Sequence, residues 1–532
     1  MRHSDHSPHA RRLRRLALPL LLAGLPLFVA AAAPADTPTA PRAAREQRMD
    51  VMPSDARFGQ QWWLQAVAAG NTGAAGLIKA WDRSTGAPVS GSGPVVAVLD
   101  SGITAHPELD ARRLPGYDFV SDAVYAGDGN GRDNDPTDPG DAITTAERLA
   151  NPTAFSGCPD APFSSWHGTV IAGQVAAVSN NVEGVAAANW NGRFLPVRVA
   201  GKCGAAVADI IDGLRWAAGL PVAGVPANAN PARIILLGYG APEACDLAST
   251  NAEVARVARL YTDALAEVRA AGALVIAAAG NLRSGVARPA SCTGAFAVTS
   301  LNREGYKANY ANFGPQVALA TPGGDMAAGN TCDEELADAG IVSTGNLGET
   351  TVGAAGYVAA SGSSFAGPVV GGTAALMLAV NPALTVAELT DGLTRSARPH
   401  VQVPLLGSCS STLPGRCTCT TSTCGAGVLD ADQALVFAAA PRSYAAPARS
   451  APTLDDTRLR TCAQKLGLPV PPSGGASQPQ PTPTPTPTPT PDTGGGGSGG
   501  SGGGGMGTDA GLGLLAACAA LRALQAQRRR RR

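Results

Sequence analysis

The stretch VVAVLD, residues 95–100, is a short run of apolar and β-branched residues that ends in an acid. Three later stretches have the same character: FLPVRVAG (194–201), RIILLGYG (233–240) and ALVIAAAG (273–280). Continuously apolar runs of this length are typical of strands that are buried on both faces of a sheet. They predict a set of buried, parallel strands.

Longer segments with helical spacing lie between these strands. Examples are VADIIDGLRWAAG (207–219) and AEVARVARLYTDALAEVRAAG (252–272). Alternation of such strands and helices predicts an α/β fold: a doubly wound, mostly parallel sheet with helices on both faces. Functional groups of these folds gather at the carboxyl ends of the strands.

Two titratable residues stand out because of where they lie. Asp100 closes the first strand, and an acid buried at that position needs a partner. His167 begins a helical apolar stretch in SSWHGTVIAGQVAAV and could supply that partner. His106, His167 and His400 are the only histidines after the first 35 residues.

A third candidate lies in SGSSFAGPVVGG (361–372), directly before the apolar run TAALMLAV. Ser364 stands where this glycine-rich turn meets a helix, so its hydroxyl can point into a cleft. The amides at a helix N-terminus can also face a developing negative charge. Asp, then His, then Ser is one of the chain orders in which hydrolytic triads recur.

Four stretches resemble the motifs of the subtilisin-like serine proteases (subtilases) in order and spacing. They are VVAVLDSGI (95–103), HGTVIAG (167–173), AAAGN (277–281) and GSSFAGP (362–368). The resemblance covers roughly residues 56–436 and is to the bacterial secreted type. It implies a secreted serine endopeptidase that hydrolyses peptide bonds in protein or peptide substrates and needs no cofactor for catalysis.

The resemblance also implies a role for each candidate residue. Ser364 is expected to be the nucleophile that forms an acyl-enzyme, His167 the general base and acid, and Asp100 the group that orients the imidazole. Asn281 is expected to donate its side-chain amide to the oxyanion, beside the backbone N–H of Ser364.

Gly238, Tyr239 and Gly240 occupy the positions where subtilases usually have Ser-Leu-Gly. In the family this strand pairs with the substrate backbone, and backbone pairing needs no particular side chain. Because Gly-Tyr-Gly replaces Ser-Leu-Gly here, the side-chain specificity of other subtilases cannot be assigned to this chain. His106, after the first motif, is expected to be structural, and His400 is expected to lie in a solvated loop.

The termini differ in charge from the rest of the chain. The net charge is zero, but residues 1–35 carry +4 and residues 506–532 carry +5, which leaves the middle near −9. This distribution gives no electrostatic reason to expect nucleic-acid binding. Residues 1–35 have a basic stretch, an apolar stretch and small residues, which is typical of a secretory signal peptide rather than a permanent membrane anchor.

Only residues 36–57 separate this signal from the expected catalytic domain, residues 58–440. They form a short pro-segment or N-terminal extension, too short for the inhibitory folding domain that subtilases commonly carry. Either the enzyme folds unaided, with help from disulfides, or the segment is a vestige.

Order is expected to dissolve after about residue 440. Residues 441–478 are expected to be an extension in which RSYAAPARSAPTLDD (442–456) is loosely packed, followed by a Pro/Thr and Gly/Ser linker at 479–505. Residues 506–532 are apolar and end in five arginines. This tail resembles bacterial GlyGly-CTERM sorting signals, which implies a membrane sorting protease as partner, transient membrane anchoring, and release or display at the cell surface. An ordinary weak anchor is the alternative.

Ten of the eleven cysteines lie between Cys158 and Cys462. In an exported chain this number indicates up to five disulfides, with the pairing left open. A zinc knuckle at Cys417, Cys419 and Cys424 is less favoured, because paired CxxC spacing and a nearby histidine are both absent from that stretch.

The loop AGDGNGRDNDPTDPGDA (126–142) is rich in acids and glycines, a composition that suits structural Ca²⁺. Asp128, Asp133 and Asp135 are the candidate ligands, and Asp138 and Asp141 follow them in the same loop. A solvated acidic loop is the alternative, because the glutamate that ends an EF-hand loop is lacking.

Two other functions remain open at this point. A surface-displayed binding protein on a disabled protease scaffold would have lost a triad member, and all three are present. An enzyme that passes the acyl group to an amine would show narrow cleavage preference.

Overall fold

The computed structural model describes residues 51–88, 93–327, 332–467 and 470 of the 532-residue chain. The predicted signal peptide, most of the short segment after it, the linker and the sorting tail lie outside the described residues. Residues 58–440, the predicted catalytic domain, are by contrast described almost throughout.

Seven parallel strands form the central sheet, in the order β2-β3-β1-β6-β7-β8-β9. This confirms the predicted parallel sheet. The strands of the central sheet are β1 (Val95–Asp100), β2 (Tyr117–Asp118), β3 (Arg193–Arg198), β6 (Ile234–Leu237), β7 (Leu274–Ala278), β8 (Phe296–Leu301) and β9 (Val317–Pro322). Two small antiparallel pairs accompany it, β4 (Ala200–Gly201) with β5 (Gly204–Ala205) and β10 (Ile341–Asn346) with β11 (Ala355–Ala360).

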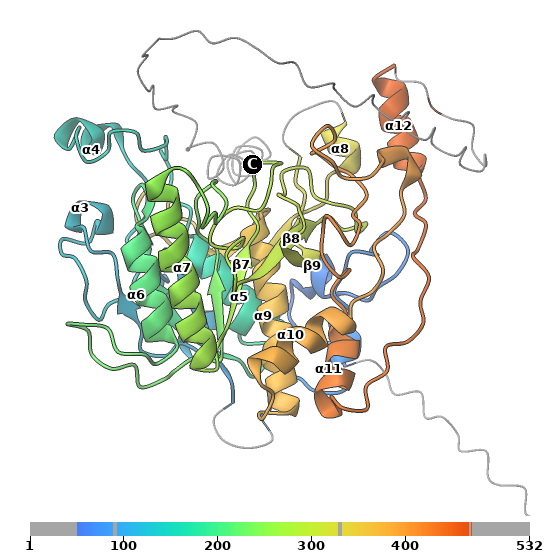
Figure 1. The fold of residues 1–532 in the computed structure, drawn as a ribbon, viewed down its shortest axis with the longest axis horizontal. Helices are drawn as coiled ribbons and strands as arrows, with labels where there is room; N and C mark the ends of the chain where they lie inside the picture. The colour runs from blue at the N-terminus through green and yellow to red at the C-terminus, as the bar shows by residue number, and fades with distance from the viewer. Residues whose placement is uncertain (1–50, 89–92, 328–331, 468–469, 471–532) are drawn as a thin grey trace, which may run out of the picture. The chain divides into compact units, whose positions relative to one another are not determined.

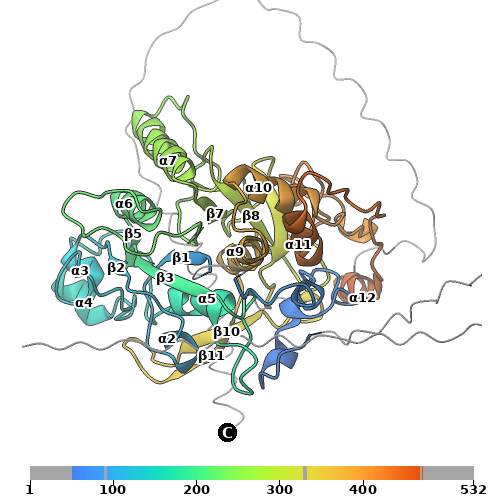
Figure 2. The ribbon, with the colours of Figure 1, turned by 90° about the horizontal axis from the view of Figure 1, so that it is seen from below.

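Helices cover both faces of the sheet, as expected. Figure 2 shows α6 and α7 on one side of the strands and α5 and α9 on the other. The described helices are α1 (Leu77–Trp81), α2 (Pro107–Asp110), α3 (Ala123–Ala126), α4 (Thr145–Ala150), α5 (His167–Ala176), α6 (Val207–Ala217), α7 (Ala252–Ala270), α8 (Asp333–Leu336), α9 (Ser363–Val380), α10 (Val386–Arg395), α11 (Ala431–Ala439) and α12 (Thr457–Lys465), with short 3₁₀ helices η1 (Phe58–Gln60), η2 (Trp62–Leu64) and η3 (Pro404–Leu406).

Two hydrophobic cores result from the alternation of side chains along each strand. In β1, Val96 and Val98 pack into the core beneath α5 and α9, whereas Ala97 and Leu99 pack into the core beneath α6 and α7. Because every second residue faces the opposite core, these strands must be apolar throughout. That is the pattern that identified them in the sequence.

Helix α9 passes through the centre of the larger core (Figure 1). It is long and apolar enough to cross a membrane, but almost all of it is buried inside the protein. Its apolar character therefore follows from its place in the core. The helix begins directly after Gly362, so the glycine-rich turn brings Ser363 and Ser364 to the level of the strand ends.

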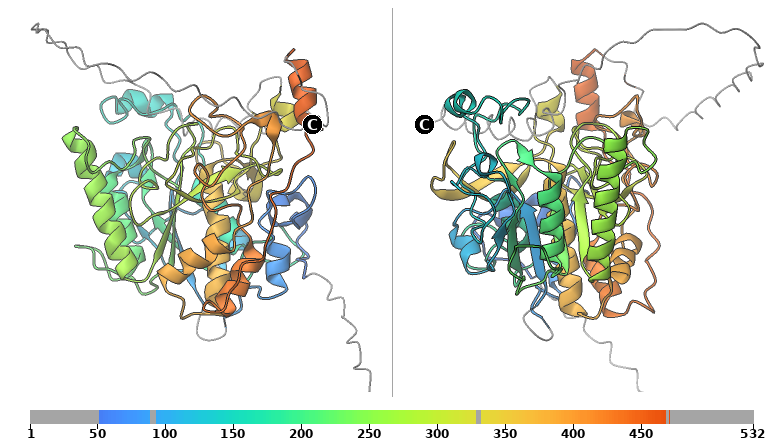
Figure 3. Two further views of the ribbon diagram at one scale, coloured as in Figure 1. Left: turned by 45° about the vertical axis from the view of Figure 1, so that its right-hand side comes forward. Right: turned by 60° about the vertical axis from the view of Figure 1, so that its left-hand side comes forward.

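The C-terminal extension is more tightly attached than the sequence indicates. Helix α12 lies beside α8 (Figure 3), and a disulfide joins Cys462 to Cys332. Leu459 is buried in a small cluster that includes Tyr306. The prediction that order dissolves after about residue 440 is therefore wrong for α12, because the apolar side of this helix packs against a cluster that the local sequence does not reveal.

Candidate active site

The carboxyl ends of neighbouring strands bring the candidate residues together. Asp100 is the last residue of β1, Gly238 directly follows β6, and Asn281 follows β7 by three residues. Because β1, β6 and β7 are adjacent in the sheet, these residues lie along one edge.

Asp100 and His167 form a hydrogen-bonded pair. The imidazole Nδ1 of His167 lies 2.8 Å from Oδ1 and 2.9 Å from Oδ2 of Asp100. Asp100 is 1% exposed, and its Oδ1 also accepts the backbone N–H of Ser101 at 2.8 Å. With Nδ1–H directed at the carboxylate, the lone pair of Nε2 is left free to accept a proton.

The surroundings of His167 act on its pKa in opposite directions. Burial disfavours the imidazolium, whereas the charge of Asp100 and its hydrogen bond favour it. Asp141 and Asp138 add further negative charge nearby. The net result is that the pKa of His167 is raised above its ordinary value.

Ser364 and the Asp100–His167 pair meet at Gly238. A Cβ atom placed on Gly238 would lie 2.9 Å from Cε1 of His167, 3.1 Å from Oδ2 of Asp100 and 3.3 Å from Cβ of Ser364. The hydroxyl of Ser364 donates to the carbonyl oxygen of Gly238 at 3.1 Å.

Asn281 is held with its amide nitrogen directed away from α9. Its Oδ1 accepts both the backbone N–H of Ser363 at 2.9 Å and the Ser363 hydroxyl at 2.8 Å. Nδ2 must therefore point in the other direction, and it lies 3.6 Å from the position that a Cβ of Gly362 would take. Within the described residues the N–H of Ser364 has no hydrogen-bond partner, as expected in the first turn of a helix.

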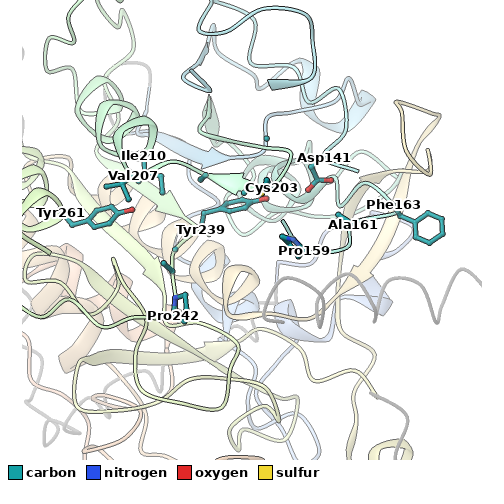
Figure 4. A pocket seen from close by; sticks show the side chains of 15 residues that line it. Asp141, Pro159, Ala161, Phe163, Cys203, Val207, Ile210, Tyr239, Pro242 and Tyr261 are labelled. Carbon is teal, nitrogen blue, oxygen red and sulfur yellow. The ribbon is translucent and has the colours of Figure 1, made fainter. Parts of the chain in front are cut away.

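A pocket of about 210 Å³ adjoins this group (Figure 4). Tyr239 is part of its wall and also contacts the His167 ring, with 5.4 Å between ring centroids. The lining is mainly apolar; its residues are Asp141, Pro159, Ala161, Phe163, Gly201, Cys203, Gly204, Ala205, Val207, Ile210, Tyr239, Gly240, Ala241, Pro242 and Tyr261. Two of the three predicted substrate-binding residues thus line the pocket, and the third, Gly238, lies beside Asp100, His167 and Ser364.

The structure does not assemble Asp128, Asp133 and Asp135 into a cation site. Asp128 Oδ2 accepts a hydrogen bond from buried Arg198 at 2.7 Å. Asp133 and Asp135 accept backbone N–H groups two residues further along their own loop. Among the described residues, no group of three carboxylates brings its ligand atoms within 4.8 Å. Of the three predicted ligands, Asp128 thus receives positive charge from Arg198.

Another pair of acids fits a cation better. Asp55 and Glu108 are 4% and 2% exposed, and within the described residues Asp55 Oδ1 and Glu108 Oε2 have no hydrogen-bond partner. Burial raises the pKa of both, that of Glu108 to about 7, despite a hydrogen bond from the Tyr357 hydroxyl. Such oxygens suit Ca²⁺. Sequence reasoning missed them because the two acids come from separate segments with no shared motif.

The remaining histidines and cysteines are structural. His106 is buried with Nε2 3.0 Å from the Gly356 carbonyl oxygen, as expected. The prediction for His400 is wrong: it is 5% exposed and contacts the Gly425 carbonyl oxygen at 3.0 Å. The ten cysteines within the described residues all pair, which speaks against the zinc knuckle; the disulfides are Cys158–Cys203, Cys245–Cys292, Cys332–Cys462, Cys409–Cys417 and Cys419–Cys424.

Comparisons with known proteins agree with this geometry. Residues 91–429 match the family model described as "Subtilase family". The chain is 40% identical over 389 residues to an "Extracellular protease" from Xanthomonas campestris pv. campestris, covering 73% of this chain and 57% of that protein. It is 36% identical over 354 residues to an "Extracellular basic protease" from Dichelobacter nodosus, covering 65% and 52%. It thus spans little more than half the length of these relatives.

A solved structure is also similar. The structure titled "Proteases from Pseudoalteromonas arctica PAMC 21717" has 38% sequence identity and a TM-score of 0.59. The match covers 73% of this chain and 99% of that one. Sequence and fold therefore point to the same group of proteins.

Proposed function

The chain belongs to the subtilase family, and from that premise we propose that it is a secreted serine endopeptidase that forms an acyl-enzyme on Ser364. The observation that carries the proposal is the gathering of Asp100, His167 and Ser364 around Gly238. An acid hydrogen-bonded to an imidazole, with an alcohol on the other side of the same glycine, provides the parts of a hydrolytic triad.

In the proposed reaction the Ser364 oxygen attacks the carbonyl carbon of the scissile peptide while Nε2 of His167 takes the hydroxyl proton. Asp100 holds the imidazole in the right tautomer and stabilises the imidazolium. His167 then gives the proton to the leaving amine. Water then attacks the acyl-enzyme in the same way, with His167 again taking and returning a proton, and Ser364 is regenerated.

The oxyanion of each tetrahedral intermediate would lie between Nδ2 of Asn281 and the backbone N–H of Ser364. Both are donors whose direction is fixed before substrate arrives, since Asn281 is anchored through its Oδ1. Preorganised donors stabilise a developing charge without a reorganisation cost. A subtilisin asparagine in this role is the example from which a 10²–10³-fold effect on turnover is known.

Substrate would bind as an extended strand beside Gly238–Gly240, with an apolar side chain in the adjoining pocket. Gly240 lets the protein's own Arg288 segment pack against this strand, because a Cβ there would lie 2.1 Å from the Arg288 carbonyl oxygen. Hydrogen bonds between main chains supply affinity in this mode, and side-chain pockets supply preference.

Secretion is part of the proposal, supported by the signal-like first 35 residues and by the extracellular relatives. Removal of the tail by a membrane sorting protease, with transient anchoring, is a prediction from residues 506–532. Mass spectrometry of the mature protein tests it: a product that still contains Arg528–Arg532 would contradict removal.

A structural calcium ion is the last part of the proposal, and its site differs from the acidic loop predicted from sequence. Asp55 and Glu108 would hold it through the two oxygens that otherwise lack partners. The ion would stabilise the fold without taking part in the reaction.

The test of the function compares peptide cleavage by the wild-type protein, Ser364→Ala and Ser422→Ala. Ser422 is an exposed serine far along the chain from the site and serves as the matched control. We expect kcat to fall by about 10⁴-fold or more in Ser364→Ala and to stay unchanged in the control. Equal cleavage by wild type and Ser364→Ala would refute the proposed function.

A further inference from the structure

The residue after Asp100 links the two halves of the Asp100–His167 pair. The Ser101 hydroxyl oxygen accepts the backbone N–H of Gly168, directly after His167, at 3.2 Å. The Ser101 backbone N–H donates to Asp100 Oδ1 at 2.8 Å. Ser101 therefore touches the carboxylate through its backbone and the start of α5 through its side chain.

Packing between these segments is close. A Cβ on Gly168 would lie 2.2 Å from the carbonyl oxygen of Gly102 and 3.2 Å from Cβ of Asp100. Because there is no free space between the start of α5 and the turn after β1, a change in the position of Ser101 is passed directly to His167.

The orientation of the Ser101 hydroxyl is set by Asp138. Its Oδ2 accepts the Ser101 hydroxyl at 2.7 Å, and its Oδ1 accepts the backbone N–H of Gly140 at 2.9 Å. Asp138 is 1% exposed, so both carboxylate oxygens are committed inside the protein. A serine hydroxyl that donates its proton to Asp138 must present a lone pair to the N–H of Gly168.

The loop that carries Asp138 is fastened to the same turn at two further points. The N–H of Ile103 donates to the Pro136 carbonyl oxygen at 3.0 Å. Arg198, which fills the acidic part of the loop, donates through Nε to the Ser101 carbonyl oxygen at 3.2 Å. Hydrogen bonds from the acidic loop and Arg198 thus hold the turn that follows Asp100 in place.

We propose that Asp138 is a positioning residue for peptide hydrolysis: acting through the Ser101 hydroxyl, it holds the start of α5 so that His167 faces both Asp100 and Ser364. The proposal rests on the proposed function. It gives the acidic loop a task at the active site in place of metal binding.

The charged groups that face His167 come from two elements. Asp100 lies at the end of β1, and Asp138 and Asp141 lie in the loop before α4; the charge of Arg198 on β3 acts on Asp138. All three acids favour the imidazolium. Burial and the charge of Asp141 raise the pKa of Asp138 to about 7, so Asp138 favours the imidazolium mainly above that pH. Loss of this charge, or of the Asp100 alignment that Asp138 maintains, therefore lowers the pKa of His167.

The test is a double-mutant cycle of kcat with Ser101→Ala, Asp138→Asn and the combined variant. Asparagine has one acceptor oxygen where Asp138 uses two, so either Ser101 or Gly140 loses its partner. We expect kcat of Asp138→Asn to fall about tenfold with KM changed less than about twofold. In the Ser101→Ala background the same substitution is expected to change kcat by less than about twofold.

Two further measurements separate positioning from general stability. The acid limb of the pH profile of kcat is expected to move to lower pH in Asp138→Asn, and Ser101→Thr, which keeps the hydroxyl, is expected to retain kcat within about threefold. Asp263→Asn removes an exposed acid on α7 and is the matched control, with an unchanged profile. If Asp138→Asn does not fold, the Ser101→Ala and Ser101→Thr pair decides the question.

Additive effects in the cycle, or a lower melting temperature with unchanged kcat and pH profile, would overturn the role of Asp138 while leaving the proposed function intact. Wild-type protein that cleaves no faster than Ser364→Ala would instead refute the proposed function, and the positioning role with it.

Discussion

At the scale of single residues, Gly238 has a role that depends on glycine having no side chain. It supplies the carbonyl oxygen that accepts the Ser364 hydroxyl, and its missing side chain leaves space beside His167, Asp100 and Ser364. The sequence predicted Gly238 as part of a substrate-binding strand. It could not indicate that three distant segments would close around this position.

Gly238→Ala is therefore expected to reduce kcat by about 10²-fold, because the new Cβ would displace the His167 ring. The backbone of Gly238 does not have a positive φ, so alanine is compatible with the fold. Gly285→Ala is the matched control, since a Cβ there meets no atom within 4 Å. Equal kcat values for the two variants would contradict this account of the site.

The pH dependence of kcat follows from His167. Only the neutral imidazole can take the Ser364 proton, so activity rises as the pH passes the pKa of His167, which lies above its usual 6.5. Asp100→Asn removes the main favourable charge and is expected to lower this pKa and to cut kcat by about 10⁴-fold, as the equivalent change does in trypsin. A rate profile with its acid midpoint below 6.5 in the wild-type protein would be inconsistent with this arrangement.

At the scale of helices, strands and loops, disulfides join irregular segments to each other and to helices. Cys332–Cys462 ties α12 to α8 across 130 residues, whereas Cys419–Cys424 closes a loop of only 5. Sequence reasoning predicted the number of bridges and the exported setting. It left the pairing open, because partners are determined by which loops meet on the folded sheet.

Loop length predicts which bridge matters more for stability. In the chain-entropy picture, replacing Cys332 and Cys462 by alanine is expected to lower the free energy of unfolding by about 5 kcal/mol, and replacing Cys419 and Cys424 by about 2 kcal/mol. Denaturant unfolding of the two double variants measures the difference. A larger loss for the short bridge would show that native-state contacts, and not chain entropy, dominate.

For the whole molecule, the parallel sheet and the order of Asp100, His167 and Ser364 could be predicted because each element carries its own local pattern. Asp138 and the Asp55–Glu108 pair could not be assigned, because their partners lie in other segments. The acidic loop illustrates the limit: its composition suits calcium, but the local sequence does not reveal that Arg198 from a neighbouring strand contacts Asp128.

Calcium is expected to bind at Asp55 and Glu108, outside the acidic loop, and so to join two segments that are distant in the sequence. At a concentration about a hundredfold above Kd, it should raise the melting temperature by about 4 °C, because the ion binds the folded state only. Glu108→Gln should abolish most of this rise, while Asp135→Asn, in the acidic loop, should leave it unchanged. The reverse pattern would place the ion in the acidic loop.

The most direct test of the central claim is to locate the adduct that a serine-directed fluorophosphonate forms with the wild-type protein. Peptide mass spectrometry is expected to find the added mass on Ser364 alone, and a denatured sample is expected to carry none. Modification of Ser361 or Ser363 in place of Ser364, or equal labelling of folded and denatured protein, would contradict the assignment of the nucleophile.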